Sequence, residues 1–316
     1  MTQNLEPPNF RTRETFRSGH GDVAFWRPYV DITLAQAGLS GGDSAPLSGF
    51  NSTYPTFICG DVVLKFFGHL EHWSDSYRFE RAALDLVSTD PEIAAPELLD
   101  SGFLFDDRES GWAWLITKRV PGQAIWRVNP DPSEREAIAA DLGQQIQRIH
   151  ALTSDDVATH ADWATVDVTA GARDSSLPPH LVEQVDDYVN LLGPPDPVFI
   201  NADIVANHVY IEQGRIVGII DWGDALIADR HIELMQIYRD LFACDRNLFR
   251  VFLEASNWPI TEDFPRKALA YGLHRQALMK AQHQGGGDVF EPIAERFPLD
   301  EIATLDELAG ILFDVR

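Results

Sequence analysis

The segment at 199–234 constrains the fold more than any other part of the chain. It reads FINADIVANHVYIEQGRIVGIIDWGDALIADRHIEL, and apolar runs in and just before it predict three short strands, at 197–201, 208–211 and 215–220. Gln213-Gly214 predicts the turn between the last two strands. Asp203 follows the first strand and Asp221 ends the third. Because a hairpin links these two acidic strand ends, we expect the two carboxylates to lie close together.

These two carboxylates fit two kinds of chemistry. With Asn207 and His208 between them, they suit a divalent cation that prefers oxygen ligands. One carboxylate can instead accept a proton from a nucleophile. Isolated aspartates are more often turn or helix-cap residues. The same segment continues with three further acidic residues, which favours a functional site: Asp224, Asp229 and Glu233.

The N-terminal half predicts a small α+β lobe over 46–120. TFICG and DVVLKFF, at 56–67, indicate two strands joined at Gly60-Asp61, and GWAWLITKRV at 111–120 indicates another. Between them a helix is predicted, with one apolar face made of Phe79, Ala83, Leu86 and Val87. Residues 1–45 are mixed in character and predict no element.

The second half is predicted to be mostly helical. Pro132-Ser133 with Glu136 indicates a helix start, and its apolar stripe follows a 3.6 period: Ile138, Leu142, Ile146 and Ile149. A second stripe consists of Leu181, Val185, Tyr188, Val189 and Leu192. Helices are expected from Glu233 to the end. A boundary near 120–125 therefore separates two domains, 1–120 and 121–316.

Charge and composition exclude several classes of protein. The 316 residues include 49 acidic and 25 basic side chains, a formal net charge of −24, which disfavours nucleic acid and anionic membranes as partners. The acidity favours a cationic partner, or serves only solubility. No apolar run approaches the roughly 20 residues of a membrane span. The N-terminus lacks the apolar core of a signal peptide, and the two cysteines make no disulfide framework. We expect a cytoplasmic protein.

The motifs at 199–234 resemble those of the aminoglycoside phosphotransferases, a family with the protein-kinase-like fold, and hygromycin B kinases look most similar. The family pattern is H-G-D-x-H-x-x-N, then I-D-[WF]-x-[DE]-A and D-P-x-x-D-L. The matching residues here are Asn201-Ala202-Asp203, His208, Ile220-Asp221-Trp222-Gly223-Asp224-Ala225, Asp229 and Glu233-Leu234. The resemblance implies a bilobal α+β fold, with a small N-terminal antiparallel-sheet lobe and a larger helical C-terminal lobe. It implies an ATP-dependent (or GTP-dependent) kinase that phosphorylates a hydroxyl of a small-molecule antibiotic.

The same resemblance assigns the nucleotide-binding residues. Lys65, in VVLKFF, would hold the nucleotide phosphates, and Glu80 in the following helix would be its ion-pair partner. The loop at 47–57 would cover the phosphates with Asn51, Ser52 and Thr53. The backbone from Ile116 to Lys118 would face the adenine.

The resemblance also assigns a base and a metal site. Asp203 would orient the acceptor hydroxyl and take its proton, and Asp221 would hold Mg²⁺. Two departures from the pattern stand out: Asn201 replaces a histidine, and His208 replaces the metal-binding asparagine. Imidazole is a poorer Mg²⁺ ligand than an amide oxygen. Three arrangements remain open: His208 binds the metal, Asn207 does so after a backbone shift, or Asp221 holds it almost alone.

The substrate is expected against the helical lobe. Candidate contacts are Asp224, Glu262, Asp263, His274 and Arg275. The acidic members suit a cationic aminoglycoside such as hygromycin B, although each is individually more typical of a helix cap or a solvated face. Arg275 suits an anionic or neutral substrate instead. We expect a monomer or weak dimer.

Other functions remain open at this stage. The chain fits a kinase of another small molecule, such as a nucleoside antibiotic, a sugar or an amino alcohol. His208 in place of asparagine also suits a nucleotide-binding pseudokinase. An unrelated metal-dependent hydrolase would leave Lys65 and Glu80 without a role.

Overall fold

The chain divides into two compact units. The computed structural model describes residues 5–39, 45–49, 53–105, 111–155, 157, 166–282 and 287–315. The first unit consists of Met1–Pro91, Ala95–Pro121 and Ile220–Asp224, and the second of Glu92–Ala94, Gly122–Ile219 and Ala225–Arg316. A single boundary at 120 does not describe this division, because the short segment that carries Asp221 packs with the first unit.

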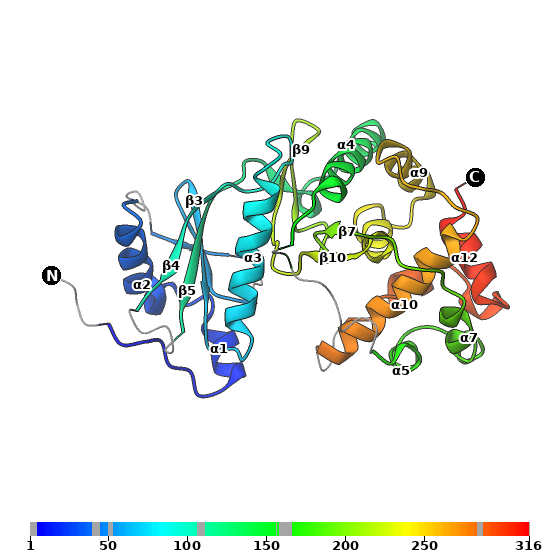
Figure 1. Ribbon diagram of the computed structural model, residues 1–316, viewed down its shortest axis with the longest axis horizontal. Coiled ribbons are helices and arrows are strands. Elements are labelled where there is room, and N and C mark those ends of the chain that lie inside the picture. Colours follow the sequence, from blue (N-terminus) through cyan, green and yellow to red (C-terminus); the bar gives the residue numbers. More distant parts are fainter. Residues whose placement is uncertain are drawn as a thin grey trace. The chain divides into compact units, whose positions relative to one another are not determined.

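The first unit is built on a five-stranded antiparallel sheet with the order β1-β2-β3-β5-β4. Figure 1 labels β3, β4 and β5 of this sheet. The strands are β1 (Leu47–Ser48), β2 (Thr56–Cys59), β3 (Val62–Phe67), β4 (Leu98–Phe103) and β5 (Ala113–Lys118). The predicted strands at 56–67 and 111–120 are confirmed. The sequence did not predict β4, whose LLDSGF contains Asp and Gly, residues that are depleted in strands.

Helix α3 (Trp73–Val87) packs against β3, β4 and β5. Its buried side chains are Tyr77, Glu80, Ala83, Leu84 and Val87. The buried face of the helix therefore differs from the predicted one, because Phe79 and Leu86 are only half-buried. Glu80 lies on the observed buried face, where Lys65 pairs with it.

Two N-terminal helices that the sequence did not predict complete this unit, α1 (Arg13–Gly19) and α2 (Val23–Gln36). Trp26 of α2 is fully buried and stacks on Phe66 of β3, with ring centroids 5.2 Å apart. Pro28 lies inside α2, near its start. Burial of large aromatic side chains, rather than helix propensity, stabilises this segment.

The second unit begins with a short strand, β6 (Gln123–Ala124), and the long helix α4 (Pro132–Ala151). The helix buries the predicted stripe from Ile138 to Ile149. Its capping box joins Asp131 to Glu134, instead of the predicted Ser133 and Glu136. The aspartate one residue before Pro132 is the N-cap, and proline takes the first helical position.

The three predicted strands at 197–220 form, but in two sheets. β8 (Val209–Glu212) and β9 (Arg215–Ile219) make a hairpin whose turn residues, Gln213 and Gly214, have φ of 51° and 74°. β6 joins this hairpin. β7 (Pro197–Ile200) instead pairs with an unpredicted strand, β10 (Leu226–Asp229). The residues that follow β7 and those that follow β9 therefore come after strands of two different sheets.

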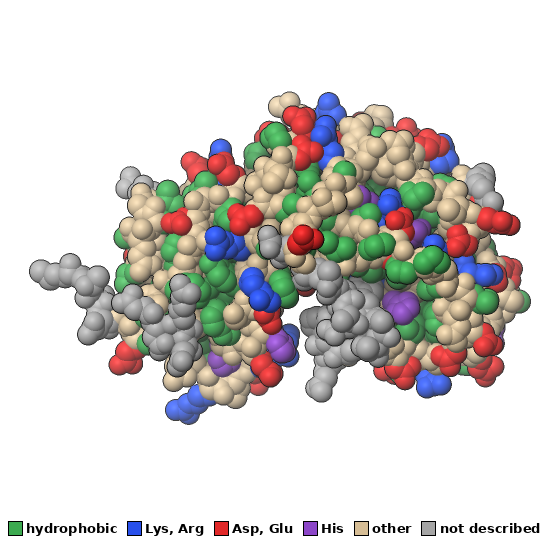
Figure 2. Space-filling view, viewed as in Figure 1, with side chains coloured by type: hydrophobic (Ala, Val, Ile, Leu, Met, Phe, Trp, Pro, Cys, Tyr) green, Lys and Arg blue, Asp and Glu red, His purple; other side chains and the backbone are tan. Residues whose placement is uncertain are grey.

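Helices form the rest of the second unit. They are α5 (Val168–Arg173), α6 (Pro179–Val182), α7 (Val185–Asn190), α8 (Leu234–Gln236), α9 (Arg246–Ala255), α10 (Phe264–Gln282), α11 (Glu291–Ala294) and α12 (Leu305–Phe313), with a π-helix at Ile237–Leu241 and 3-10 turns at Ile125–Arg127, Arg230–Glu233 and Leu299–Glu301. The stripe predicted at 181–192 is split between α6 and α7. α4 packs on α9, and α10 packs on α5 and α12. None of the helices in the described ranges is long and apolar enough to cross a bilayer. Figure 2 shows acidic side chains spread over the visible face.

Asp229 connects β10 to the following 3-10 turn. Its Oδ1 accepts from the backbone N–H of His231 at 2.9 Å, and its Oδ2 accepts from that of Asp196 at 2.8 Å. His231 Nδ1 lies 2.7 Å from Oδ1. Burial acts to raise the pKa of Asp229, but His231 and these backbone donors outweigh it and lower the pKa.

This lowered pKa predicts a contribution to acid stability. The unfolded chain binds the Asp229 proton more readily than the folded protein does, so the contribution is fully present above about pH 4 and is lost as pH falls. We expect the free energy of unfolding, measured in urea, to fall less steeply between pH 7 and pH 3 for Asp229→Asn than for the wild type. A variant with the same slope as the wild type would contradict this.

Candidate active site

Three charged side chains meet in the first unit. Lys65 Nζ, from the central strand β3, lies 2.7 Å from Glu80 Oε2 and 3.1 Å from Asp221 Oδ1. Glu80 comes from the buried face of α3, and Asp221 lies two residues after the end of β9. The predicted pairing of Lys65 with Glu80 is present, and Asp221 is a second carboxylate on the same ammonium group.

The environment keeps Lys65 charged. Burial acts to lower the pKa of Lys65, but the carboxylates of Asp221 and Glu80 more than offset it, so its pKa is raised. Burial raises the pKa of Glu80, which Lys65 partly offsets. Asp221 has φ of 60°, a backbone conformation that is uncommon outside glycine and gathers at functional sites. A Cβ added at Gly223 would lie 3.2 Å from Glu80 Oε2, so a larger residue there would require a small shift of Glu80.

The second unit carries the loop that follows β7. Ala202 has φ of 64°, which accounts for the glycine of the family pattern at this position. The Asn201 side-chain Oδ1 accepts the backbone N–H of Asp203 at 3.0 Å. An amide thus stabilises the loop where the pattern has a histidine. Ala202 C=O accepts from Arg275 at 2.8 Å, and His208 Nδ1 lies 3.0 Å from Asp203 C=O.

The side chain of Glu233 holds the backbone of this loop. Its side chain is fully buried, and Oε1 accepts the backbone N–H groups of Asn201 and Ala202, both at 3.1 Å. Its Oε2 lies 3.0 Å from Nε2 of His150, the penultimate residue of α4. Three segments that are distant in sequence therefore fix the backbone just before Asp203.

The carboxylate of Asp203 is surrounded by donors. Oδ1 accepts from Gln236 Nε2 at 3.1 Å and from an Arg275 amino group at 3.3 Å, and Oδ2 lies 3.2 Å from His208 Nδ1. Burial acts to raise the pKa of Asp203, but His208, Arg275 and Gln236 outweigh it and lower the pKa. Asp203 is therefore ionised at neutral pH and can accept a hydrogen bond from an alcohol.

His208 and Asn207 follow in the turn before β8. The Nδ1 of His208 faces the carbonyl oxygen of Asp203, which can only accept, so Nδ1 carries the proton in the neutral ring and Nε2 the lone pair. Asn207 is half-buried beside it. His208 thus has a defined role in holding the Asp203 backbone, whichever residue binds a metal.

Of the other predicted nucleotide residues, the structure describes Thr53, Ile116 and Lys118. Asn51 and Ser52 fall outside the described residues, and Thr53 is exposed. Ile116 lies in β5 between β3 and β4, and the backbone N–H of Lys118 donates to Glu97 C=O at 2.8 Å. These backbone groups are thus engaged within the sheet.

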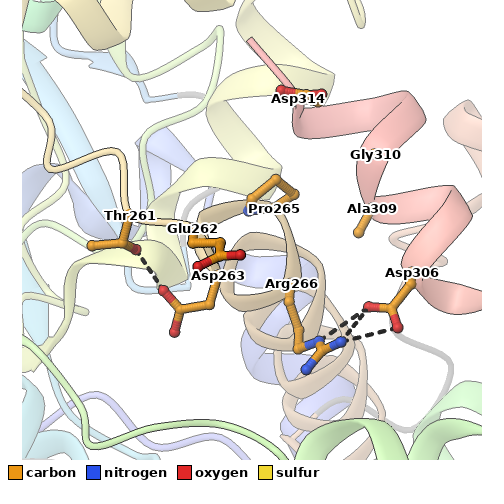
Figure 3. A pocket seen from close by; sticks show the side chains of 9 residues that line it. All are labelled: Thr261, Glu262, Asp263, Pro265, Arg266, Asp306, Ala309, Gly310 and Asp314. Carbon is orange, nitrogen blue, oxygen red and sulfur yellow. Dashed lines mark hydrogen bonds and ion pairs between the residues drawn. The ribbon is translucent and has the colours of Figure 1, made fainter. Parts of the chain in front are cut away.

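The predicted substrate residues do not form one cluster. Glu262 and Asp263 line an open groove of about 720 Å³ between the start of α10 and α12, where Arg266 reaches Asp306 (Figure 3). His274 and Arg275 lie on the same helix, roughly 18 Å further along from Asp263. Arg275 contacts Asp203. Asp224 is exposed in the first unit, where its charge acts on Glu80.

Two residues that the sequence did not single out in these roles are Gln236 and His150. Gln236 sits at the end of α8, where the π-helix begins, and His150 ends an apolar stripe. A π-helical turn is a known mark of functional sites, but its hydrogen bonds are visible only in the structure.

Removal of the Glu233 carboxylate gives a sharp test of the loop. Glu233→Ala leaves two buried backbone N–H groups unsatisfied, so we expect the free energy of unfolding to fall by about 3 kcal/mol. Glu254→Ala, which removes an exposed partner of Arg250, should change it by less than about 0.5 kcal/mol. Urea unfolding measures both. Equal effects of the two variants would show that Glu233 does not hold the loop.

The sheet of the first unit, its lysine–glutamate pair and the helical second unit define a kinase-like fold. A solved structure of an aminoglycoside 2′-phosphotransferase in complex with GDP matches with a TM-score of 0.60 at 19% identity, covering 89% of this chain and 98% of that one. A complex of an aminoglycoside phosphotransferase with AMP-PNP and hygromycin B matches with a TM-score of 0.55 at 19% identity, covering 80% and 92%. The predicted fold class is confirmed.

The sequence comparison identifies the family. The model of the phosphotransferase enzyme family matches residues 53–265, more than half of the chain, and the chain belongs to that family. An aminoglycoside 3′-phosphotransferase of Escherichia coli is 28% identical over 149 residues, which cover 42% of this chain and 55% of the relative. The chain spans about half the length of the curated relatives it matches.

Proposed function

We propose that this protein transfers the terminal phosphoryl group of a nucleoside triphosphate to a hydroxyl group of an aminoglycoside. The observation that carries the proposal is the ammonium group of Lys65, fixed between Glu80 and Asp221. A buried cation oriented by two carboxylates suits the phosphates of a nucleotide, whose transfer needs positioning and charge neutralisation more than covalent chemistry. The family match supports the same reaction class.

We propose that Asp203 acts on the acceptor hydroxyl. Its ionised carboxylate would orient the acceptor hydroxyl and take its proton, while the loop bonds to Glu233 and Arg275 keep the carboxylate in place. The lowered pKa of Asp203 does not prevent this, because the alcohol's proton leaves late when the transition state is loose.

Mg²⁺ is the metal that this reaction implies, and the donor set fits it in part. Asp221 offers a partly exposed carboxylate and Asn207 an amide oxygen, both hard ligands, whereas His208 offers only a nitrogen. We therefore propose that Asp221 holds the metal. When bound, the metal would neutralise charge on the nucleotide phosphates.

The net charge of −24 supports a cationic acceptor, and the names of the relatives support an aminoglycoside. Hygromycin B is our first candidate, because a structural neighbour was solved with it. ATP and GTP both remain candidates, since neighbours were solved with AMP-PNP and with GDP. We place the reaction in the cytoplasm, where these nucleotides are available.

The test is a coupled assay of nucleoside diphosphate release with Mg²⁺ and either ATP or GTP. The panel contains hygromycin B, other aminoglycosides, a nucleoside antibiotic and simple sugars, and product mass confirms each phosphorylation. We expect turnover on an aminoglycoside. Turnover only on sugars or nucleosides would replace the proposed substrate class. Tight nucleotide binding without any transfer would favour the pseudokinase instead.

A further inference from the structure

Arg275 bonds to the loop that carries the candidate base. It lies on α10, 72 residues from Asp203 in sequence, and its side chain is 12% exposed. One amino group donates to Ala202 C=O at 2.8 Å and the other to Asp203 Oδ1 at 3.3 Å. We predicted from the sequence that Arg275 contacts substrate. The structure shows the guanidinium bonded to its own chain, and the substrate contact stays a prediction.

A second donor reaches the same oxygen. Gln236 is 4% exposed, and its Nε2 donates to Asp203 Oδ1 at 3.1 Å. A carboxylate oxygen has two lone-pair directions in its plane. Arg275 and Gln236 together supply two donors to Oδ1, which is the number that its two lone pairs accept.

Oδ2 has a different environment. Its partner among the described side chains is His208, whose Nδ1 lies 3.2 Å away. The same Nδ1 lies closer, at 3.0 Å, to the backbone C=O of Asp203, and the ring has a single proton there to share between them. Oδ2 therefore keeps at least one lone pair for another donor.

We propose that Arg275 and Gln236 are positioning residues that saturate Oδ1 of Asp203 and so assign the acceptor hydroxyl to Oδ2. The inference rests on the proposed phosphoryl transfer. In that step the O–H bond of the acceptor breaks and its proton passes to Oδ2. The new O–P bond forms as the bond between the γ-phosphorus and the β–γ bridging oxygen breaks, and nucleoside diphosphate leaves with that electron pair.

The test separates positioning from stability. Arg275→Met removes both hydrogen bonds while keeping much of the side-chain volume, so the carboxylate can rotate. We expect kcat to fall about 10²-fold with the KM for nucleotide within about twofold of wild type. Added guanidinium ion at millimolar concentration should restore part of kcat in this variant only. Arg275→Lys keeps the charge but reaches one acceptor at a time. Its kcat should therefore lie between those of the wild type and of Arg275→Met.

Arg239→Met is the matched control. The Arg239 side chain is 16% exposed and likewise bonds one carboxylate, Asp240, and one backbone carbonyl, that of Val289. Its loss should lower the melting temperature about as much as Arg275→Met does, but leave kcat within about twofold of wild type.

Each outcome decides the inference. Gln236→Met, which removes the other donor without removing a charge, should also lower kcat selectively, and it replaces Arg275→Met if that variant does not fold. An active wild type whose Arg275→Met and Gln236→Met variants keep its kcat, or lose it only as Arg239→Met does, would overturn the inference and leave the proposed function standing. A wild type that phosphorylates nothing in the panel would overturn both.

Discussion

Asp203→Asn should lower kcat about 10³-fold, while the dissociation constant for nucleotide stays within about twofold. The amide keeps the shape of the carboxylate, and its oxygen can still accept from Gln236 and Arg275 at the position of Oδ1. An NH₂ group then stands at the position of Oδ2 and cannot take the proton of the acceptor. The loss should therefore fall on the chemical step.

Single-turnover kinetics and calorimetric titration with a non-hydrolysable nucleotide separate these two quantities. Asp196→Asn is the control, because it makes the same chemical change in a carboxylate that pairs with Arg230. We expect it to leave kcat unchanged within about twofold. If the Asp203→Asn enzyme kept a tenth or more of the wild-type kcat, the assignment of Asp203 as the base would be wrong.

The second large effect is expected at Lys65. Lys65→Met removes the cation that Glu80 and Asp221 share, so their two carboxylates lie close together without a compensating charge. Removing one partner of a buried ion pair typically costs 3–5 kcal/mol, and we expect the free energy of unfolding to fall by about 3 kcal/mol. Loss of a charge-assisted phosphate contact should weaken nucleotide binding on the order of 10- to 100-fold.

A double variant distinguishes the two effects. Lys65→Met with Glu80→Gln removes one uncompensated carboxylate, so part of the stability should return while nucleotide binding stays weak. Arg81→Met, on the exposed side of α3, is the control for loss of a surface cation. Recovery of nucleotide affinity in the double variant would argue that Lys65 acts only through stability and not through the phosphates.

Local patterns predicted the elements whose signal is contained within about 20 residues. The α4 stripe, the β2–β3 pair and the β8–β9 turn at Gln213-Gly214 all formed as expected. The elements that were missed lack such a signal. β10 is a four-residue LIAD that becomes a strand only because β7 pairs with it. α6 and α7 share one apolar stripe, but the backbone turns between them at Glu183 and Gln184.

For the site, the resemblance supplied Lys65, Glu80, Asp203 and Asp221, and the contacts of the first two are as expected. The supports of Asp203 could not be predicted, because spacing along the chain does not encode them. Arg275 and Gln236 are 72 and 33 residues from Asp203, and their own segments do not indicate that they contact it. Arg275 was singled out for its charge, but its partner was unknown until α10 was placed.

The supports of the Asp203 loop also have a kinetic meaning. Glu233 joins His150 to Asn201 and Ala202 across sequence separations of 83, 32 and 31 residues, and Arg275 closes a separation of 72. Contacts between residues so far apart in the sequence form slowly, because loop entropy is lost before any bond compensates for it. During synthesis the loop cannot take its final geometry until α10 has left the ribosome. We therefore expect the Asp203 loop to reach its final geometry late in folding, after the Lys65–Glu80 pair has formed.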